Sequence, residues 1–291
     1  MIQFSSQQKE AINTGARKRK GLLNQTKKVV QRVLGETRDE YLDAILSGTT
    51  GIGKTYLSEK ALKEANIPHI KLQGSTSMFA FAGDLMLIHS KKPKGEKVVI
   101  LVDDCDSFFE NKTNMNILKG MTGKQGTRVF QYKKKVQESN FTEAQWEVMP
   151  NYQKEGMHGF TVPCDDFVFL FTTNFPFPTE ASAKEYSAKN PGSSKGNRLM
   201  DLAAVAGRMN YRDFTLQSKN ENWGWIAEVG LNDGGLDMLE SDSDKMILLD
   251  WMWNNWSELR GTSVRIMEQL AYDMVDYPDD YRDEWEASYL V

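Results

Sequence analysis

A single run of eight residues constrains the fold of this chain more than any other feature. The run Gly48-Thr49-Thr50-Gly51-Ile52-Gly53-Lys54-Thr55 matches the pattern G-x-x-x-x-G-K-[ST] at every fixed position. Its glycines let backbone N–H groups turn inward around phosphate oxygens without Cβ clashes. Lys54 places a positive charge on the β- and γ-phosphates, and the Thr55 hydroxyl completes the coordination of Mg²⁺. The run therefore predicts a nucleoside triphosphate site, with ATP and Mg²⁺ as ligands.

The sequence around this loop is typical of alternating strands and helices. Residues 41–47 predict a short strand that leads into the loop, and residues 55–64 predict a helix whose N-terminus faces the anion. Further strands are predicted at 67–72, 97–102 and 167–172, and further helices at 75–90, opened by Ser75, Thr76 or Ser77, and at 114–122. The run at 97–102 is apolar throughout, as in strands buried on both faces. We predict an α/β fold: a parallel sheet covered by helices, with a small C-terminal helical lid.

The chain divides into three predicted regions. Residues 1–40 form a basic helical segment, residues 41–217 a nucleotide-binding α/β core, and residues 218–291 a helical lid with an acidic tail. In the first region we expect the helix to break at Gly15, Gly21 and Gly35.

Two segments outside the predicted strands look irregular. Residues 181–197 are rich in Ser, Ala, Lys and Gly and predict a mobile loop, and residues 218–242 place Trp223 and Trp225 beside Gly-rich turns. After them the pattern predicts helices at 243–259 and 263–274.

The charge of the chain limits the classes of partner that it can attract. The formal net charge is −4, so no global field attracts polyanions. Two runs of one sign stand out: a basic one (Arg17, Lys18, Arg19, Lys20, Lys27, Lys28, Arg32) and an acidic one (Asp273, Asp276, Asp279, Asp280, Asp283, Glu284, Glu286). Each is either a partner surface or a solvated helix face.

The remaining composition favours a soluble, cytoplasmic protein that does not contact membranes. Cys105 and Cys164 lie beside apolar runs and predict buried thiols in a reducing compartment. The three histidines (His69, His89, His158) show no metal-ligand spacing. No apolar run approaches the length of a membrane span.

Carboxylates follow the apolar strand at 97–102. A buried strand that ends in a carboxylate brings Asp103 beside the phosphate loop, where it can hold Mg²⁺. Asp104 is the candidate that orients and polarises the attacking water. Asp106 either caps the following helix or takes part in catalysis. The amide of Asn174, at the tip of the strand at 167–172, is placed to bind the γ-phosphate or the water, although Asn is also an ordinary turn former.

In this order, these elements resemble the Walker A, Walker B and sensor-1 motifs of an AAA+ ATPase, over residues 40–275. The run from Leu202 to Arg208 is similar to the helix that ends in an arginine finger, which acts on a neighbouring subunit's nucleotide. Ser263-Val264-Arg265 is similar to the sensor-2 pattern, which contacts the nucleotide. The resemblance implies a homo-oligomeric ring, a hexamer, with Arg208 acting in trans. Arg212, expected one helical turn away, and Arg198 compete for that role.

An insertion at 123–163, with strands predicted at 128–132 and 159–162, resembles the hairpin before sensor 1 in one AAA+ branch. That branch includes viral helicases, protein unfoldases and chelatase-like remodellers, and the chain is similar to small phage-encoded AAA+ ATPases. In such rings the hairpin tip points into the pore. The insertion carries cations and aromatic residues that suit a nucleic-acid backbone and its bases, or a solvated hairpin: Arg128, Phe130, Tyr132, Lys133, Lys134, Lys135 and Trp146.

Two functions follow from these alternatives. The first is a nucleic-acid motor or loader in phage-type DNA metabolism. The second is a protein-remodelling ring that grips a polypeptide with Phe79 or Phe81 of the run Met78-Phe79-Ala80-Phe81, residues that equally suit a buried helix face.

Overall fold

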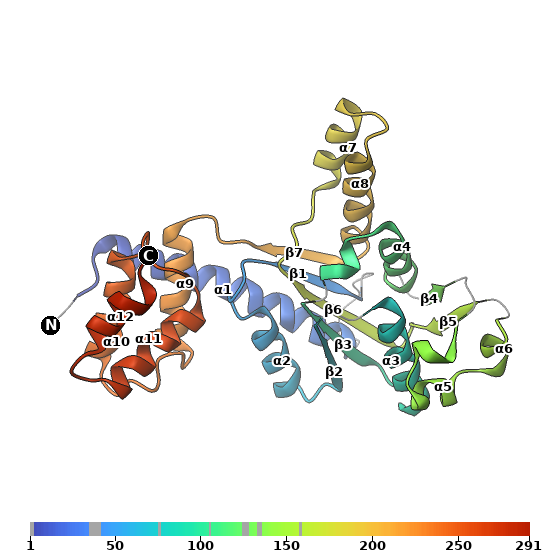
Figure 1. Cartoon of the computed structure of the whole chain (residues 1–291), viewed down its shortest axis with the longest axis horizontal. Coiled ribbons are helices and arrows are strands. Elements are labelled where there is room, and N and C mark those ends of the chain that lie inside the picture. Colours follow the sequence, from blue (N-terminus) through green and yellow to red (C-terminus); the bar gives the residue numbers. More distant parts are fainter. Residues whose placement is uncertain are drawn as a thin grey trace. The chain divides into compact units, whose positions relative to one another are not determined.

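The computed structural model describes residues 3–34, 42–74, 77–104, 106–123, 128–132, 136–156 and 159–291 (Figure 1). The chain forms two compact units. The first comprises Met1–Asn24, Thr49–Lys54 and Phe214–Val291, and the second Gln25–Gly48 and Thr55–Asp213. The domain limits predicted from the sequence stay predictions. No helix among the described residues is long and apolar enough to cross a membrane.

A five-stranded sheet, counted over the described residues, organises the second unit (Figure 1). Its strands are β1 Ala44–Gly48, β2 His69–Gln73, β3 Val98–Asp103, β6 Phe167–Thr173 and β7 Asn210–Phe214, in the order β2-β3-β6-β1-β7. The pairs β2–β3, β3–β6 and β1–β6 are parallel, as predicted. Every residue of β1, β3 and β6 is buried, as their apolar sequences require. The carboxyl ends of these strands meet at one edge, where Asp103 pairs with Thr172.

Polar caps set the start of most helices. The helices are α1 Ser6–Val33, α2 Lys54–Glu64, α3 Met78–Lys91, α4 Lys112–Met121, α5 Glu143–Val148, α6 Asn151–Lys154, α7 Glu180–Lys189, α8 Ser194–Ala206, α9 Lys219–Asn232, α10 Asp242–Asn254, α11 Val264–Asp276 and α12 Tyr281–Tyr289. Ser77 caps α3, Asn111 caps α4, and Ser263 caps α11, each accepting a backbone N–H with its side chain. Such caps satisfy N–H groups that have no partner within the helix.

The predicted hairpin is present. β4 Val129–Tyr132 pairs antiparallel with β5 Phe160–Pro163, and Phe130 packs against Phe160 with ring centroids 5.7 Å apart. The short helices α5 and α6 lie in the connection between the two strands. The elaborated tip expected from the sequence is therefore partly helical.

The expectation of a mobile loop at 181–197 is wrong. This segment lies in α7 and α8, which pack side by side, and Thr179 and Ser193 cap them (Figure 1). Ala, Glu and Lys favour helix strongly enough to outweigh the serines, since serine also serves as a cap. Gly192, at φ 79°, makes the turn between the two helices.

The expectation of irregular structure at 218–242 is wrong for residues 219–232, and the expectation of helix breaks at Gly15 and Gly21 is also wrong. Residues 219–232 form α9, in which Trp223 and Trp225 are fully buried, and α1 runs unbroken through Gly15 and Gly21. A Cβ at Gly224 would lie 1.9 Å from the Ala11 carbonyl oxygen. Glycine there permits close contact between α1 and α9 and does not break a helix. Gly35 lies outside the described residues.

Contacts with α9 also account for part of the basic run. The Lys18 ammonium lies 2.9 Å from Glu221, Arg19 pairs with Asp233, and Arg32 is buried. These three cations are therefore not part of a free basic face. Cys164 is a buried thiol, as predicted, and burial raises its pKa to about 12. Cys105 lies outside the described residues.

Candidate active site

The phosphate loop leaves β1 at Gly48 and enters α2 at Lys54. Gly51 and Gly53 have φ values of 76° and 77°, in the left-handed region that favours glycine. The Lys54 ammonium donates to the Thr49 carbonyl oxygen at 2.9 Å, so the lysine folds back over its own loop. The Thr49 hydroxyl accepts from the Leu216 N–H at 2.8 Å, which ties the loop to the segment before α9.

Asp103, the last residue of β3, accepts hydrogen bonds from two hydroxyl groups. Thr55 Oγ1 and Thr172 Oγ1 both donate to Asp103 Oδ1 at 2.5 Å, and the two hydroxyl oxygens lie 3.2 Å apart. The sequence predicted Thr55 and Asp103 but assigned no role to Thr172. The signal was present, because Thr172 stands one residue before the end of a strand that neighbours β3.

These oxygens fit a magnesium site. Mg²⁺ is usually bound through one or two carboxylates together with substrate phosphates and water. Asp103 and Thr55 supply one carboxylate and one hydroxyl, both hard oxygen donors within hydrogen-bond distance. Among the described residues no group of three or more His, Cys, Asp or Glu side chains is arranged to hold a metal. Mg²⁺ at Asp103 and Thr55 would therefore need further oxygen ligands, such as phosphate or water.

Asp104 and Asn174 follow the two strands at the same edge of the sheet. Asp104 is exposed and has a φ of 53°, and its N–H donates to the Thr172 carbonyl oxygen at 3.3 Å. Asn174 is exposed directly after β6. Thr173 shapes the turn there, since its hydroxyl donates to Asp106 and accepts from the Phe175 N–H. Asp106 thus anchors the end of β6, in the first turn of a 3₁₀ helix.

The model of the family described as "ATPase family associated with various cellular activities (AAA)" matches residues 44–181. Over these residues the chain is similar to the AAA ATPase family. The matched residues include the phosphate loop and the ends of β3 and β6 described above. Arg208 and Arg265 lie beyond the matched residues.

Individual proteins similar to the chain are distant. It is 26% identical over 234 residues to an uncharacterized 36.7 kDa protein from the nrdC–mobD intergenic region of Enterobacteria phage T4. The alignment covers 78% of this chain, which spans 62% of the phage protein's length.

Among solved structures, the Thermotoga maritima RuvB Holliday junction branch migration motor has a TM-score of 0.44 at 12% identity, covering 92% of this chain and 68% of that one. A point mutant of the same motor has a TM-score of 0.46 at 14% identity, covering 91% and 70%. Scores of this size do not assign a substrate.

The candidate arginines occupy different elements. Arg208 is exposed and follows the end of α8 directly after the cap residue Gly207. Arg212 lies on β7 and not one helical turn away, so that expectation is wrong. Arg198 is exposed on α8, with its guanidinium 5.8 Å from the Phe175 ring. Arg265 is exposed in the first turn of α11.

Three residues suggested as substrate contacts are buried in the second unit. Arg128 and Phe130 are 2% and 0% exposed, and Phe81 is fully buried among core side chains. The base of the hairpin turns Arg128 and Phe130 inward, and Phe81 lies on the buried face of α3. Phe79 is half-buried, with its ring 4.3 Å from Tyr132. Lys133, Lys134 and Lys135 lie outside the described residues.

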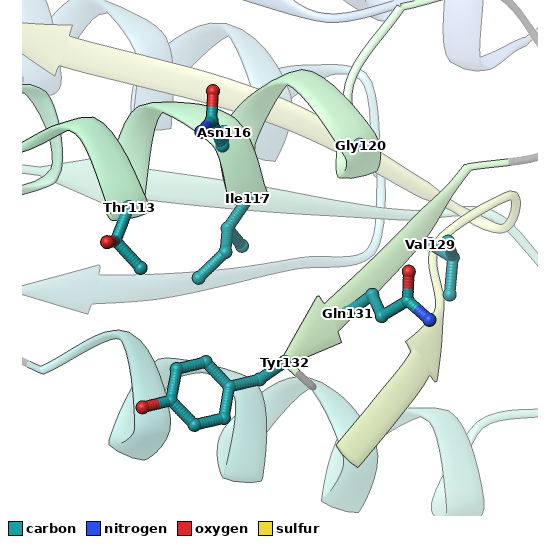
Figure 2. Close-up of a pocket in the computed structure, with 7 residues that line it drawn as sticks. All are labelled: Thr113, Asn116, Ile117, Gly120, Val129, Gln131 and Tyr132. Carbon is teal, nitrogen blue, oxygen red and sulfur yellow. The ribbon is translucent and has the colours of Figure 1, made fainter. Parts of the chain in front are cut away.

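A hollow of about 510 Å³ lies between α4 and β4. Figure 2 shows Thr113 and Ile117 of α4 across from Tyr132 and Gln131 of β4. A second hollow, bounded by Ser77 and Asn111, shares Thr113, Ile117 and Tyr132 with the first. Tyr132 therefore borders both hollows, which are lined by a mixture of polar and apolar side chains.

Proposed function

We propose that the protein is a Mg²⁺-dependent AAA+ ATPase that works as a homo-oligomeric ring, a hexamer, and couples hydrolysis to movement on nucleic acid. The observation that carries the proposal is the cluster of Thr55, Asp103 and Thr172 at the carboxyl edge of the parallel sheet. Ligands of open α/β sheets bind at this edge.

In this mechanism the loop N–H groups of residues 48–55 and Lys54 bind the phosphates, and Arg265 contacts the nucleotide. Thr55 and Asp103 would hold Mg²⁺, which would supply positive charge next to the phosphate oxygens. Asn174 orients a water molecule, and Asp104 accepts its proton. The water oxygen bonds to the γ-phosphorus as the bond to the β–γ bridging oxygen breaks, which yields ADP and phosphate.

Arg208 supplies the remaining positive charge from a neighbouring subunit. It is exposed at the end of α8, where a second copy can approach it. A guanidinium that reaches the γ-phosphate stabilises the charge of the transition state.

The ATPase rate per subunit is expected to rise with protein concentration, because each site needs the Arg208 of another copy. Arg208→Ala is expected to remove the rise and to leave nucleotide affinity unchanged. Arg198→Ala tests the rival arginine, and Lys195→Ala, which removes an exposed cation from α8, is the matched control. Steady-state ATPase assays over a concentration series measure this. A monomer that hydrolyses ATP at the full rate would contradict the trans assignment.

The nucleic-acid assignment is supported by the surroundings of Tyr132. Aromatic rings stack on exposed bases, and cations bind the phosphate backbone. Tyr132 borders two hollows whose lining includes amide and hydroxyl groups beside apolar side chains, and in the sequence it directly precedes Lys133, Lys134 and Lys135. The alternative that Phe81 grips a polypeptide is not supported, because that side chain is buried.

Single-stranded DNA is expected to raise the ATPase rate several-fold at low salt, with a steep decline as salt increases. Replacing Lys133, Lys134 and Lys135 by Ala is expected to abolish the stimulation. Replacing Lys184, Lys189 and Lys195 of α7 and α8 by Ala removes the same charge elsewhere and is the matched control. An ATPase rate that depends on protein concentration but does not change with single- or double-stranded DNA would instead favour a protein-remodelling ring.

A further inference from the structure

Lys71 places a positive charge beside the carboxylate assigned to the metal. It lies on β2, and its ammonium is 3.5 Å from Asp103 Oδ2 and 3.4 Å from Glu59 Oε1 of α2. The Asp103 side chain is 7% exposed, so solvent screens the contact only in part. The opposite oxygen, Oδ1, accepts from Thr55 and Thr172. One oxygen of Asp103 thus contacts the two hydroxyl groups, and the other contacts the Lys71 ammonium.

We propose that Lys71 sets the Mg²⁺ affinity of the site by competing with the metal for Asp103. This inference rests on the proposed function, which assigns Mg²⁺ to Asp103 and Thr55. Two cations that share one poorly solvated carboxylate repel each other, so the lysine weakens metal binding.

Glu59 controls how strongly Lys71 competes. The lysine lies at nearly equal distances from Glu59 and Asp103, so pairing with Asp103 is not obligatory. Removing the Glu59 charge leaves Asp103 as the stronger partner and increases competition. Removing the Lys71 charge ends the competition with the metal. The two substitutions are therefore expected to change Mg²⁺ affinity in opposite directions, which a purely structural role of either residue does not predict.

The test measures how the affinity for a fluorescent, non-hydrolysable ATP analogue depends on Mg²⁺, from EDTA to saturation. Lys71→Met is expected to lower the Mg²⁺ concentration at half-effect about threefold to tenfold, and Glu59→Gln to raise it about twofold to fivefold. Lys71→Arg keeps a cation and is expected to behave as wild type. Lys60→Met removes a lysine from the exposed side of α2 and is the matched control. Thermal unfolding of each variant confirms that it folds.

The outcomes separate this inference from the function on which it rests. If Mg²⁺ does not affect nucleotide binding in the wild type, or if Asp103→Asn keeps the full Mg²⁺ effect, the metal assignment fails and Lys71 loses its role with it. If the wild type responds and Asp103→Asn does not, the metal assignment stands. In that case an unchanged Lys71→Met, or shifts of the same sign in Lys71→Met and Glu59→Gln, would overturn the proposal for Lys71 alone.

Discussion

Arg128→Met is expected to lower the free energy of unfolding by about 3–5 kcal/mol at neutral pH, the usual cost of breaking a buried ion pair. The Arg128 guanidinium donates to both Asp43 oxygens, at 2.6 and 2.7 Å, and both side chains are at most 1% exposed. Methionine fills a similar volume but leaves the Asp43 carboxylate buried without its cation. Urea unfolding of the full chain measures the loss.

The size of this effect follows from how many segments the pair connects. Arg128 also donates to the carbonyl oxygens of Met121 and Phe167, and Asp43 accepts from the N–H groups of Phe169 and Gly123. The two side chains therefore hold the base of the hairpin, the end of α4 and the start of β6 to the residue before β1. Each polar atom that loses a partner adds to the cost.

A pH comparison distinguishes an unpaired charge from loss of packing. Burial raises the pKa of Asp43 to about 6, although the Arg128 charge and the hydrogen bonds lower it. A folded pKa above the unfolded value stabilises the fold below the unfolded pKa, and this stabilisation is lost as pH rises through about 6. In Arg128→Met the pKa rises further, so acidification toward about pH 5 is expected to restore part of the lost stability. Asp43→Asn is the control, because arginine cannot release its proton and acid cannot rescue that variant.

The sequence predicted the features that depend on neighbouring residues. The apolar runs gave β3 and β6, and the glycine pattern gave the loop with φ near 77° at Gly53. Residues 219–232 were missed because Gly224 looked like a turn former, whereas its role is set by contact with Ala11. Helix packing between distant segments cannot be read from local composition.

The contacts that the sequence missed depend on strand order. Arg128 looked like a surface cation because its partner, Asp43, is 85 residues away. Thr172 and Lys71 reach Asp103 only because β2 and β6 flank β3. A charge inside the short apolar strand at Lys71 was the one local signal. It becomes informative only when the neighbour of that strand is known.

Asp104→Asn is expected to lower ATP turnover about 10²- to 10⁴-fold, the usual contribution of a general base, with nucleotide affinity unchanged. The reason lies in the backbone as well as the carboxylate. Asp104 has a φ of 53°, which costs a non-glycine residue of order 1 kcal/mol, and its N–H is fixed to the Thr172 carbonyl oxygen. This conformation lets the chain leave β3 with one carboxylate in the sheet edge and the next exposed. Asparagine tolerates the left-handed region well, so the variant changes charge and basicity without disturbing the turn.

Asp106→Asn is the matched control, because the amide oxygen can still accept from Thr173. We expect its turnover to stay within a few-fold of wild type, with single-turnover assays and analogue binding measured on both variants. Loss of nucleotide affinity in Asp104→Asn would mean that the carboxylate maintains the site and does not act on the water. Wild-type turnover in Asp104→Asn with a large loss in Asp106→Asn would transfer the role of base to Asp106. Since Asp106 already accepts the Thr173 hydroxyl, a base at that position would have to release the end of β6 in each cycle, which makes Asp104 the stronger assignment.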